Sequence, residues 1–138
     1  MATTSDDLAR VPLFADLGRR DLKKLADRFR EQTLPPGTTP VREGKMSGIG
    51  FFVVAEGEAA VSVGDTVVAT LGPGDHFGEV ALISEGERTA TVTATTPLRV
   101  LVIPFYDFRE FALSNPEVMW KLLEHVVARA YPDASGTI

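Results

Sequence analysis

Cysteine is absent from the 138 residues of the chain, which excludes disulfide bonds and thiolate metal sites. A long apolar run is also missing, since no stretch approaches the ~18 residues that a membrane-spanning helix needs. The residues from Met1 to Arg10 are polar and acidic, so we expect neither a signal peptide nor a membrane anchor, and a cytoplasmic location. Positive charge is scarce, because the formal net charge is −5. Since affinity for polyanions comes mostly from cationic side chains, we expect no nucleic-acid binding by this domain alone.

The length and composition are those of one folded domain. Hydrophobic residues make up 44% of the chain and charged residues 24%, which is the ordinary range of globular proteins. A chain of this size buries roughly two-thirds of the surface that its unfolded form exposes. We therefore expect a single domain over residues 1–138.

The hydrophobic pattern divides this domain into a β-rich centre with helices on both sides. Residues 1–30 and 105–131 have the spacing of amphipathic helices, with one packing helix expected over 16–30. Residues 31–104 alternate with period two between glycine turns, which is typical of an antiparallel sandwich or barrel. Pro132 should end the last helix and leave 132–138 frayed.

The expected fold class is mainly β with flanking helices, an antiparallel β-roll or jelly-roll barrel. The strands that we expect are Glu31–Leu34, Thr39–Arg42, Gly50–Ala55, Glu58–Val63, Val67–Leu71, Ala90–Thr95 and Leu98–Ile103.

The stretch from Gly72 to Ala94 has the composition of an anion cradle. Glycines, among them Gly78, let the backbone approach a ligand, and a short apolar helical turn follows, whose first amides can donate to a phosphate. Arg88 then offers a planar guanidinium to phosphate oxygens. Glu79 carries the opposite charge, so we expect it to face a neutral hydroxylated group such as a sugar edge.

These residues resemble the phosphate-binding cassette of cyclic nucleotide-binding domains. The resemblance rests on two runs, with the arginine nine residues after the glutamate: Phe77-Gly78-Glu79-Val80-Ala81-Leu82 and Arg88-Thr89-Ala90-Thr91-Val92. The family includes bacterial catabolite activator proteins, kinase regulatory subunits and cyclic-nucleotide-gated channels. The likeness covers nearly the whole chain, from about Leu13 to Arg129, and implies a cassette over residues 77–90.

By this resemblance, Glu79 binds the ribose 2′-hydroxyl and Arg88 the cyclic phosphate. Amides near Ala81 and Thr89 complete the phosphate contacts, and the Thr89 hydroxyl contacts either the phosphate or, as in relatives that prefer cyclic GMP, the guanine amino group. Arg129 stands where relatives cover the base with a residue of the last helix. The ligand-binding set that the resemblance implies is Phe77, Gly78, Glu79, Val80, Ala81, Arg88, Thr89, Ala90 and Arg129.

The resemblance implies a sensor that binds cyclic AMP or cyclic GMP and signals by rearrangement of its C-terminal helices. Its partner would be a protein effector or a fused output domain, and a homodimer remains open. Two alternatives keep the same fold: a protein-interaction module that has lost its ligand, or the sensor half of a truncated transcriptional regulator.

An enzyme and a metal site are the remaining alternatives, and the residues favour neither. No serine has a nearby histidine or the glycine context of a nucleophile elbow. The two histidines, His76 and His125, lie in different expected elements without a carboxylate pattern, which separates the chain from metal-dependent cupins. We therefore expect no catalysis and no metal.

Overall fold

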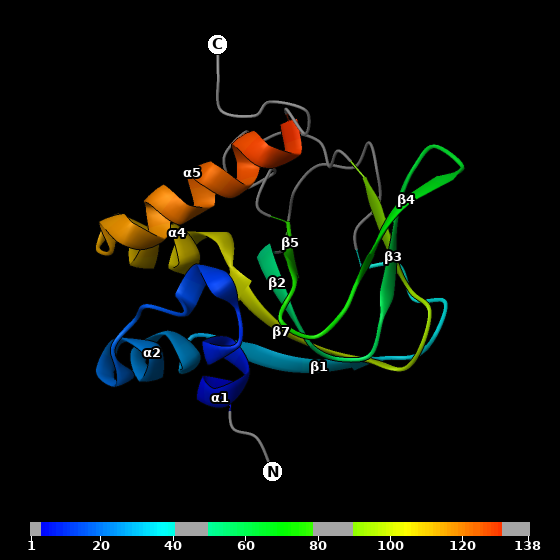
Figure 1. Ribbon diagram of the computed structural model, residues 1–138. Coiled ribbons are helices and arrows are strands. Elements are labelled where there is room, and N and C mark those ends of the chain that lie inside the picture. The colour runs from blue at the N-terminus through cyan, green and yellow to red at the C-terminus, as the bar shows by residue number, and fades with distance from the viewer. Residues whose placement is uncertain (1–3, 41–49, 79–89, 131–138) are drawn as a thin grey trace.

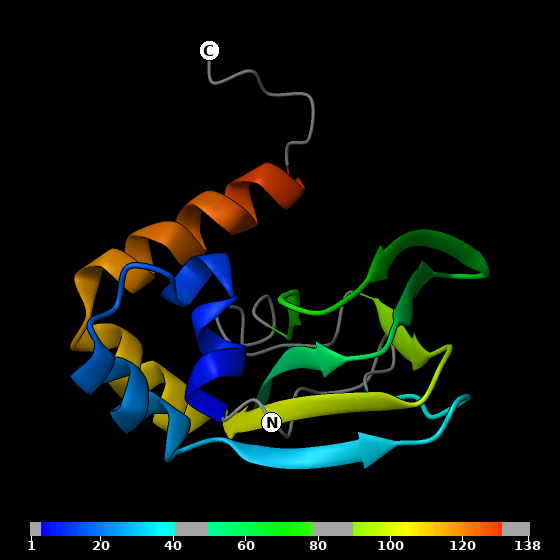
Figure 2. The ribbon, with the colours of Figure 1, turned by 60° about the horizontal axis from the view of Figure 1, so that its bottom comes forward.

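A computed structural model describes residues 4–40, 50–78 and 90–130, arranged as helices packed on one side of two antiparallel sheets (Figures 1 and 2). The helices are α1 (Thr4–Ala9), the 3-10 helix η1 (Pro12–Phe14), α2 (Arg19–Ala26), α4 (Phe105–Leu113) and α5 (Pro116–Ala130). The strands are β1 (Arg30–Leu34), β2 (Gly50–Glu56), β3 (Ala59–Val63), β4 (Thr66–Leu71), β5 (His76–Phe77), β6 (Thr91–Ala94) and β7 (Leu98–Pro104).

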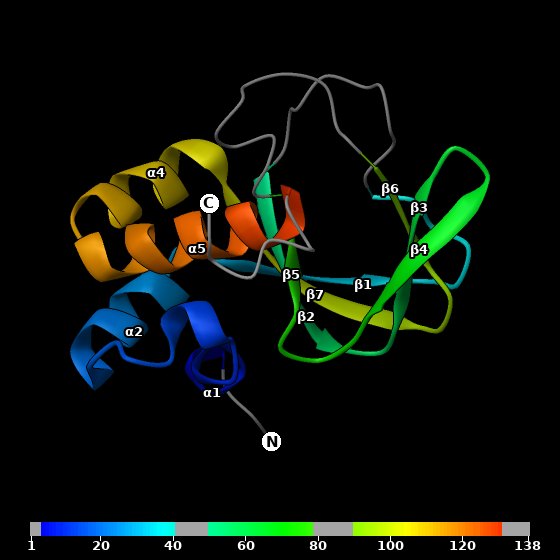
Figure 3. The same ribbon diagram turned by 45° about the horizontal axis from the view of Figure 1, so that its top comes forward.

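The strands form two separate sheets among the described residues, in the orders β1-β7-β2-β5 and β4-β3-β6 (Figure 3). This confirms the expected antiparallel sheets with flanking helices. The expected closure into a barrel is not found, because no strand pair joins the two sheets in the described part of the chain. No described helix is long and apolar enough to cross a membrane.

Alternation along β2 divides the core into two layers. Phe51 and Val53 face the helices, whereas Phe52 and Val54 face the second sheet, and all four are buried. A strand that is covered on both faces needs apolar residues at every position, which explains the continuous run from Gly50 to Ala55. The central sheet is therefore the middle layer between helices and second sheet.

Phe14 is the centre of the helical layer. Its ring makes edge contacts with Phe51 of β2 and with Phe108 and Phe111 of α4, at centroid distances of 6.3, 6.3 and 6.5 Å. Phe51 in turn stacks on Phe108 at 4.4 Å. Aromatic contacts thus join the N-terminal segment, the central sheet and the C-terminal helices into one core.

Most expected elements are confirmed, with differences at two segments. The helix expected over 16–30 is limited to Arg19–Ala26, because Gly18 is its N-cap and β1 already begins at Arg30. The strand expected over Thr39–Arg42 is not found at Thr39 or Pro40, and its remainder lies outside the described residues. The short strand β5 was not expected, since two residues are too few to show an alternation.

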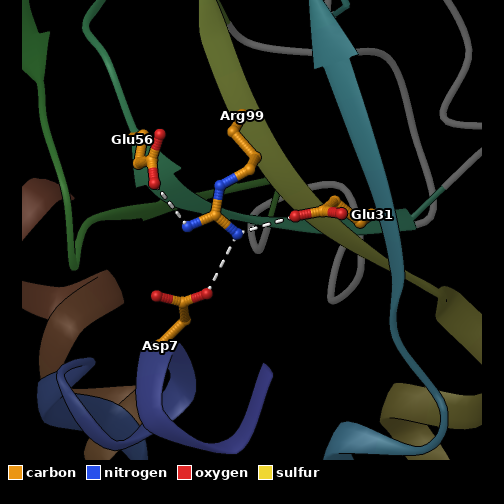
Figure 4. Close-up of polar contacts among 4 residues, drawn as sticks. All are labelled: Asp7, Glu31, Glu56 and Arg99. Atoms are coloured by element: carbon orange, nitrogen blue, oxygen red, sulfur yellow. Dashed lines mark hydrogen bonds and ion pairs between the residues drawn. The ribbon is translucent and has the colours of Figure 1, made fainter. Parts of the chain in front are cut away.

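A largely buried arginine side chain connects α1 to the central sheet. Arg99 of β7 donates hydrogen bonds to Glu31 at 2.7 Å, Glu56 at 3.0 Å and Asp7 at 3.1 Å (Figure 4). The hydrogen bond with Glu31 is the largest influence on the pKa of Arg99, which the three carboxylates together raise above its ordinary value despite the opposing effect of burial. Arg99 therefore stays charged and holds three strands and the first helix together.

Gly57, in the turn between β2 and β3, is a position that only glycine fits. Its φ is +93°, and a Cβ would lie 2.1 Å from the Pro97 carbonyl oxygen. We expect Gly57→Ala to lower the free energy of unfolding by about 2 kcal/mol, measured by urea denaturation. Gly72→Ala is the matched control, because no heavy atom lies within 4 Å of its Cβ position and its φ is not positive. Equal losses in the two variants would contradict this account.

Candidate functional site

The structure describes the two ends of the expected cassette. Phe77 lies in β5, Gly78 follows it, and Ala90 precedes β6. Glu79, Val80, Ala81, Arg88 and Thr89 lie outside the described residues. Arg129 belongs to α5, but its side chain is outside the description. The ligand roles of these residues remain predictions.

The first end of the cassette is fixed by packing on β2. Phe77 is buried and stacks on Phe52, its partner in the β2–β5 register, at a centroid distance of 4.6 Å with nearly parallel rings. Gly78 then has a φ of +99°, a left-handed conformation that favours glycine. A rigid strand end followed by a sharp change of direction therefore sets where residues 79–89 begin.

The two ends of the cassette are held by different sheets. Phe77 belongs to the sheet β1-β7-β2-β5, whereas Thr91 begins β6 in the sheet β4-β3-β6 (Figure 3). Residues 79–89 therefore connect the two layers of the sandwich.

The glycine-rich turn before β5 is built for shape and does not present its amides as free donors. The Gly72 amide donates to the Asp75 carboxylate at 2.8 Å, and the Gly74 amide donates to the Val54 carbonyl at 2.9 Å. The Val54 amide returns a hydrogen bond to the Asp75 carbonyl at 2.9 Å. These two amides are therefore not available to a phosphate, and the amides near Ala81 and Thr89, which the resemblance implies as its donors, lie outside the described residues.

A cavity of about 560 Å³ lies between this turn and α5. Its apolar lining includes Leu13, Ala69 and Leu71, and its polar lining includes Asp75 and Glu124. Volumes of roughly 300–1,000 Å³ are usual for small-molecule sites. Its cation, Lys121, already binds Asp16 at 2.5 Å and the Pro12 carbonyl at 3.3 Å. The cavity thus offers apolar surface and carboxylates, which suits a neutral ring better than a phosphate.

The two histidines meet across this region. The ring centroids of His76 in β5 and His125 in α5 are 4.4 Å apart, and those of His76 and Phe51 are 5.1 Å apart. The strand that leads into the cassette therefore touches the last helix. Sequence reasoning treated these residues separately, because nothing in a spacing of 49 positions signals a contact. Among the described residues, no group of three or more potential ligands could hold a metal ion.

Comparisons with known proteins place the chain in one family. The family model described as "Cyclic nucleotide-binding domain" matches residues 31–115. A cAMP-dependent protein kinase regulatory subunit of Yarrowia lipolytica is 47% identical over 98 residues, which are 70% of this chain and 26% of that protein. A cyclic nucleotide-gated potassium channel of Mesorhizobium japonicum is 40% identical over 111 residues, 80% of this chain and 30% of the channel.

A solved structure shows the same fold. The regulatory domain of Toxoplasma gondii PKA, crystallised with cAMP, superposes with a TM-score of 0.79 at 26% identity, over 91% of this chain and 49% of that one. The matched part of the chain spans only 26% of the length of the Yarrowia lipolytica protein and 30% of the length of the Mesorhizobium japonicum channel.

Proposed function

Because the chain belongs to the cyclic nucleotide-binding domain family, we propose that it is a regulatory domain that binds cyclic AMP or cyclic GMP and senses it without catalysis. The observation that carries the proposal is the family match over residues 31–115, which includes the whole cassette. The described flanks support it, since Phe77 and Gly78 fix the start of the cassette and β6 fixes its end.

Within the cassette, Arg88 would bind the cyclic phosphate and Glu79 the ribose 2′-hydroxyl. The amides near Ala81 and Thr89 would donate the remaining hydrogen bonds to the phosphate, a role that the Gly72 and Gly74 amides cannot take because they are already bonded. The base would lie toward the apolar residues of β4 and α5, with Arg129 near its exposed edge.

Signalling would run from the cassette to α5. The His76–His125 contact supports this proposal, because it joins the strand directly before the cassette to the last helix. Lys121 adds a second attachment of α5, to Asp16 beside η1. A ligand that binds one arrangement of these contacts better than the other would shift α5 by its difference in affinity. The output would be read by an effector protein, a fused output domain or a second copy of this chain, in the cytoplasm.

Thermal unfolding with added nucleotide tests the proposal. Cyclic AMP or cyclic GMP at about 100 times its dissociation constant should stabilise the folded state by about 2.7 kcal/mol and raise Tm by several degrees. The linear nucleotide 5′-AMP at the same concentration is the control, because it lacks the cyclic phosphate. If neither cyclic nucleotide raises Tm at millimolar concentration, the chain is a ligand-free interaction module with the same fold.

A further inference from the structure

The outer side of α5 and the end of α4 carry an apolar surface that nothing covers in the described part of the chain. We name it the α5 face: Leu113, Met119, Trp120, Leu123 and Val127. Trp120 is 64% exposed, Leu113 64% and Leu123 51%. The opposite side of the same helix is buried through Val118 and Leu122. Because Val118 and Leu122 already attach α5 to the core, the domain does not need the α5 face for its own packing. Exposed apolar patches of this kind mark interaction sites.

The α5 face is shaped to receive a helix. A groove of about 440 Å³ runs between the end of α4 and α5, lined by Leu113, Pro116, Met119, Trp120, Leu122 and Leu123. Pro116, Trp120, Leu123 and Val127 follow one another at intervals of four, three and four residues, which places them in one stripe along the helix. Such a stripe beside a groove is the arrangement that binds the apolar side of a partner helix.

The charges beside the stripe select the partner. Glu117 and Glu124 are both exposed and each follows a residue of the stripe, so they form an acidic flank. Lys121 lies between them on the same side of the helix, but its charge is already paired with Asp16, so the two glutamates leave this flank net negative. A second copy of this chain would bring the same acidic flank and a further net charge of −5. A helix with lysine or arginine beside its apolar stripe would bring the opposite charge.

We propose that the α5 face is the docking site for an amphipathic helix of a partner protein, with basic residues along the flank of its apolar stripe. This deepens the proposed function, because it names the chemistry of the effector and places it on the helix that contacts the cassette-bearing strand. Docking itself needs no nucleotide, so it can be tested without one.

The test uses Trp120, which is the only tryptophan of the chain and lies in the α5 face. Two tryptophan-free 15-residue peptides with the same leucine stripe are titrated into the nucleotide-free protein, one with lysine flanks and one with glutamate flanks. We expect the lysine peptide to shift the Trp120 emission to shorter wavelength and the glutamate peptide to have no effect. Leu123→Glu should weaken binding of the lysine peptide at least tenfold. The double variant Glu117→Gln, Glu124→Gln should weaken the same binding about three- to tenfold.

Val68→Glu is the matched control, since Val68 is an equally exposed apolar residue on β4, away from the α5 face, and should leave binding unchanged. Equal binding of both peptides, or binding that survives Leu123→Glu, would overturn the proposal. So would a concentration-dependent emission shift of the protein alone together with a doubled mass by sedimentation, because a second copy would then cover the face. None of these outcomes depends on nucleotide affinity, which the thermal experiment measures separately.

Discussion

Arg88→Ala should weaken cyclic nucleotide binding by about 10- to 150-fold, measured by isothermal titration calorimetry. Hydrogen bonds that involve a charged group contribute roughly 1.5–3 kcal/mol each, and this range converts directly into that loss of affinity. Arg88 is the proposed phosphate ligand, and the described part of the cavity beside the cassette offers no substitute, because Lys121 is bound to Asp16. Glu79→Ala should cost less, since a ribose hydroxyl carries no charge.

Arg109→Ala is the control for this experiment. Arg109 is an exposed arginine of α4 outside the cassette residues 77–90, so its removal changes the net charge equally and leaves the cassette sequence intact. The Arg109→Ala variant should bind cyclic nucleotide with the affinity of the unaltered protein to within about twofold, because salt screens the long-range effect of one surface charge. Equal affinity of the Arg88 variant and the unaltered protein would remove Arg88 from the site.

The fold could be predicted from the sequence wherever packing follows a local period. The alternation of Val61 and Val92 with half-buried neighbours, and the helical spacing of Phe108 and Phe111, match the core residues that the structure shows. Elements too short to show a period could not be predicted. One example is β5, which has two residues and exists because Phe77 packs on Phe52. The hydrophobic pattern also could not predict whether the sheets close into a barrel, because strands alternate with period two in both open and closed sheets.

The candidate site was predictable in its motif and not in its surroundings. The spacing of Glu79 and Arg88 is a feature of one continuous segment, so the sequence displays it. The His76–His125 contact and the three partners of Arg99 join residues that are far apart along the chain, and no local pattern encodes them. The same holds for the Gly72 amide, whose acceptor is chosen by the turn geometry. Glycine content indicated the turn correctly, whereas the hydrogen-bond partners of its amides follow from the folded geometry.

Arg99→Met should lower the free energy of unfolding by about 3–5 kcal/mol, measured by urea denaturation. The side chain of Asp7 is only 1% exposed, and its second oxygen Oδ1 is buried with no hydrogen-bond partner among the residues that the structure describes. Removing the guanidinium would leave this carboxylate buried without a counter-charge. Glu31 and Glu56 are largely exposed and can be rehydrated, so most of the loss comes from Asp7.

Two further variants separate this cause from a general loss of charge. Arg28→Met removes an arginine whose partners Asp107 and Glu110 are exposed, at 3.5 and 3.6 Å, and should cost less than about 1 kcal/mol. Asp7→Leu combined with Arg99→Met removes both members of the buried pair and should recover much of the stability that Arg99→Met loses, because no unpaired charge remains buried. If Arg99→Met costs no more than Arg28→Met, the attachment of α1 depends on apolar packing around Phe14, and Arg99 contributes only a solvated ion pair.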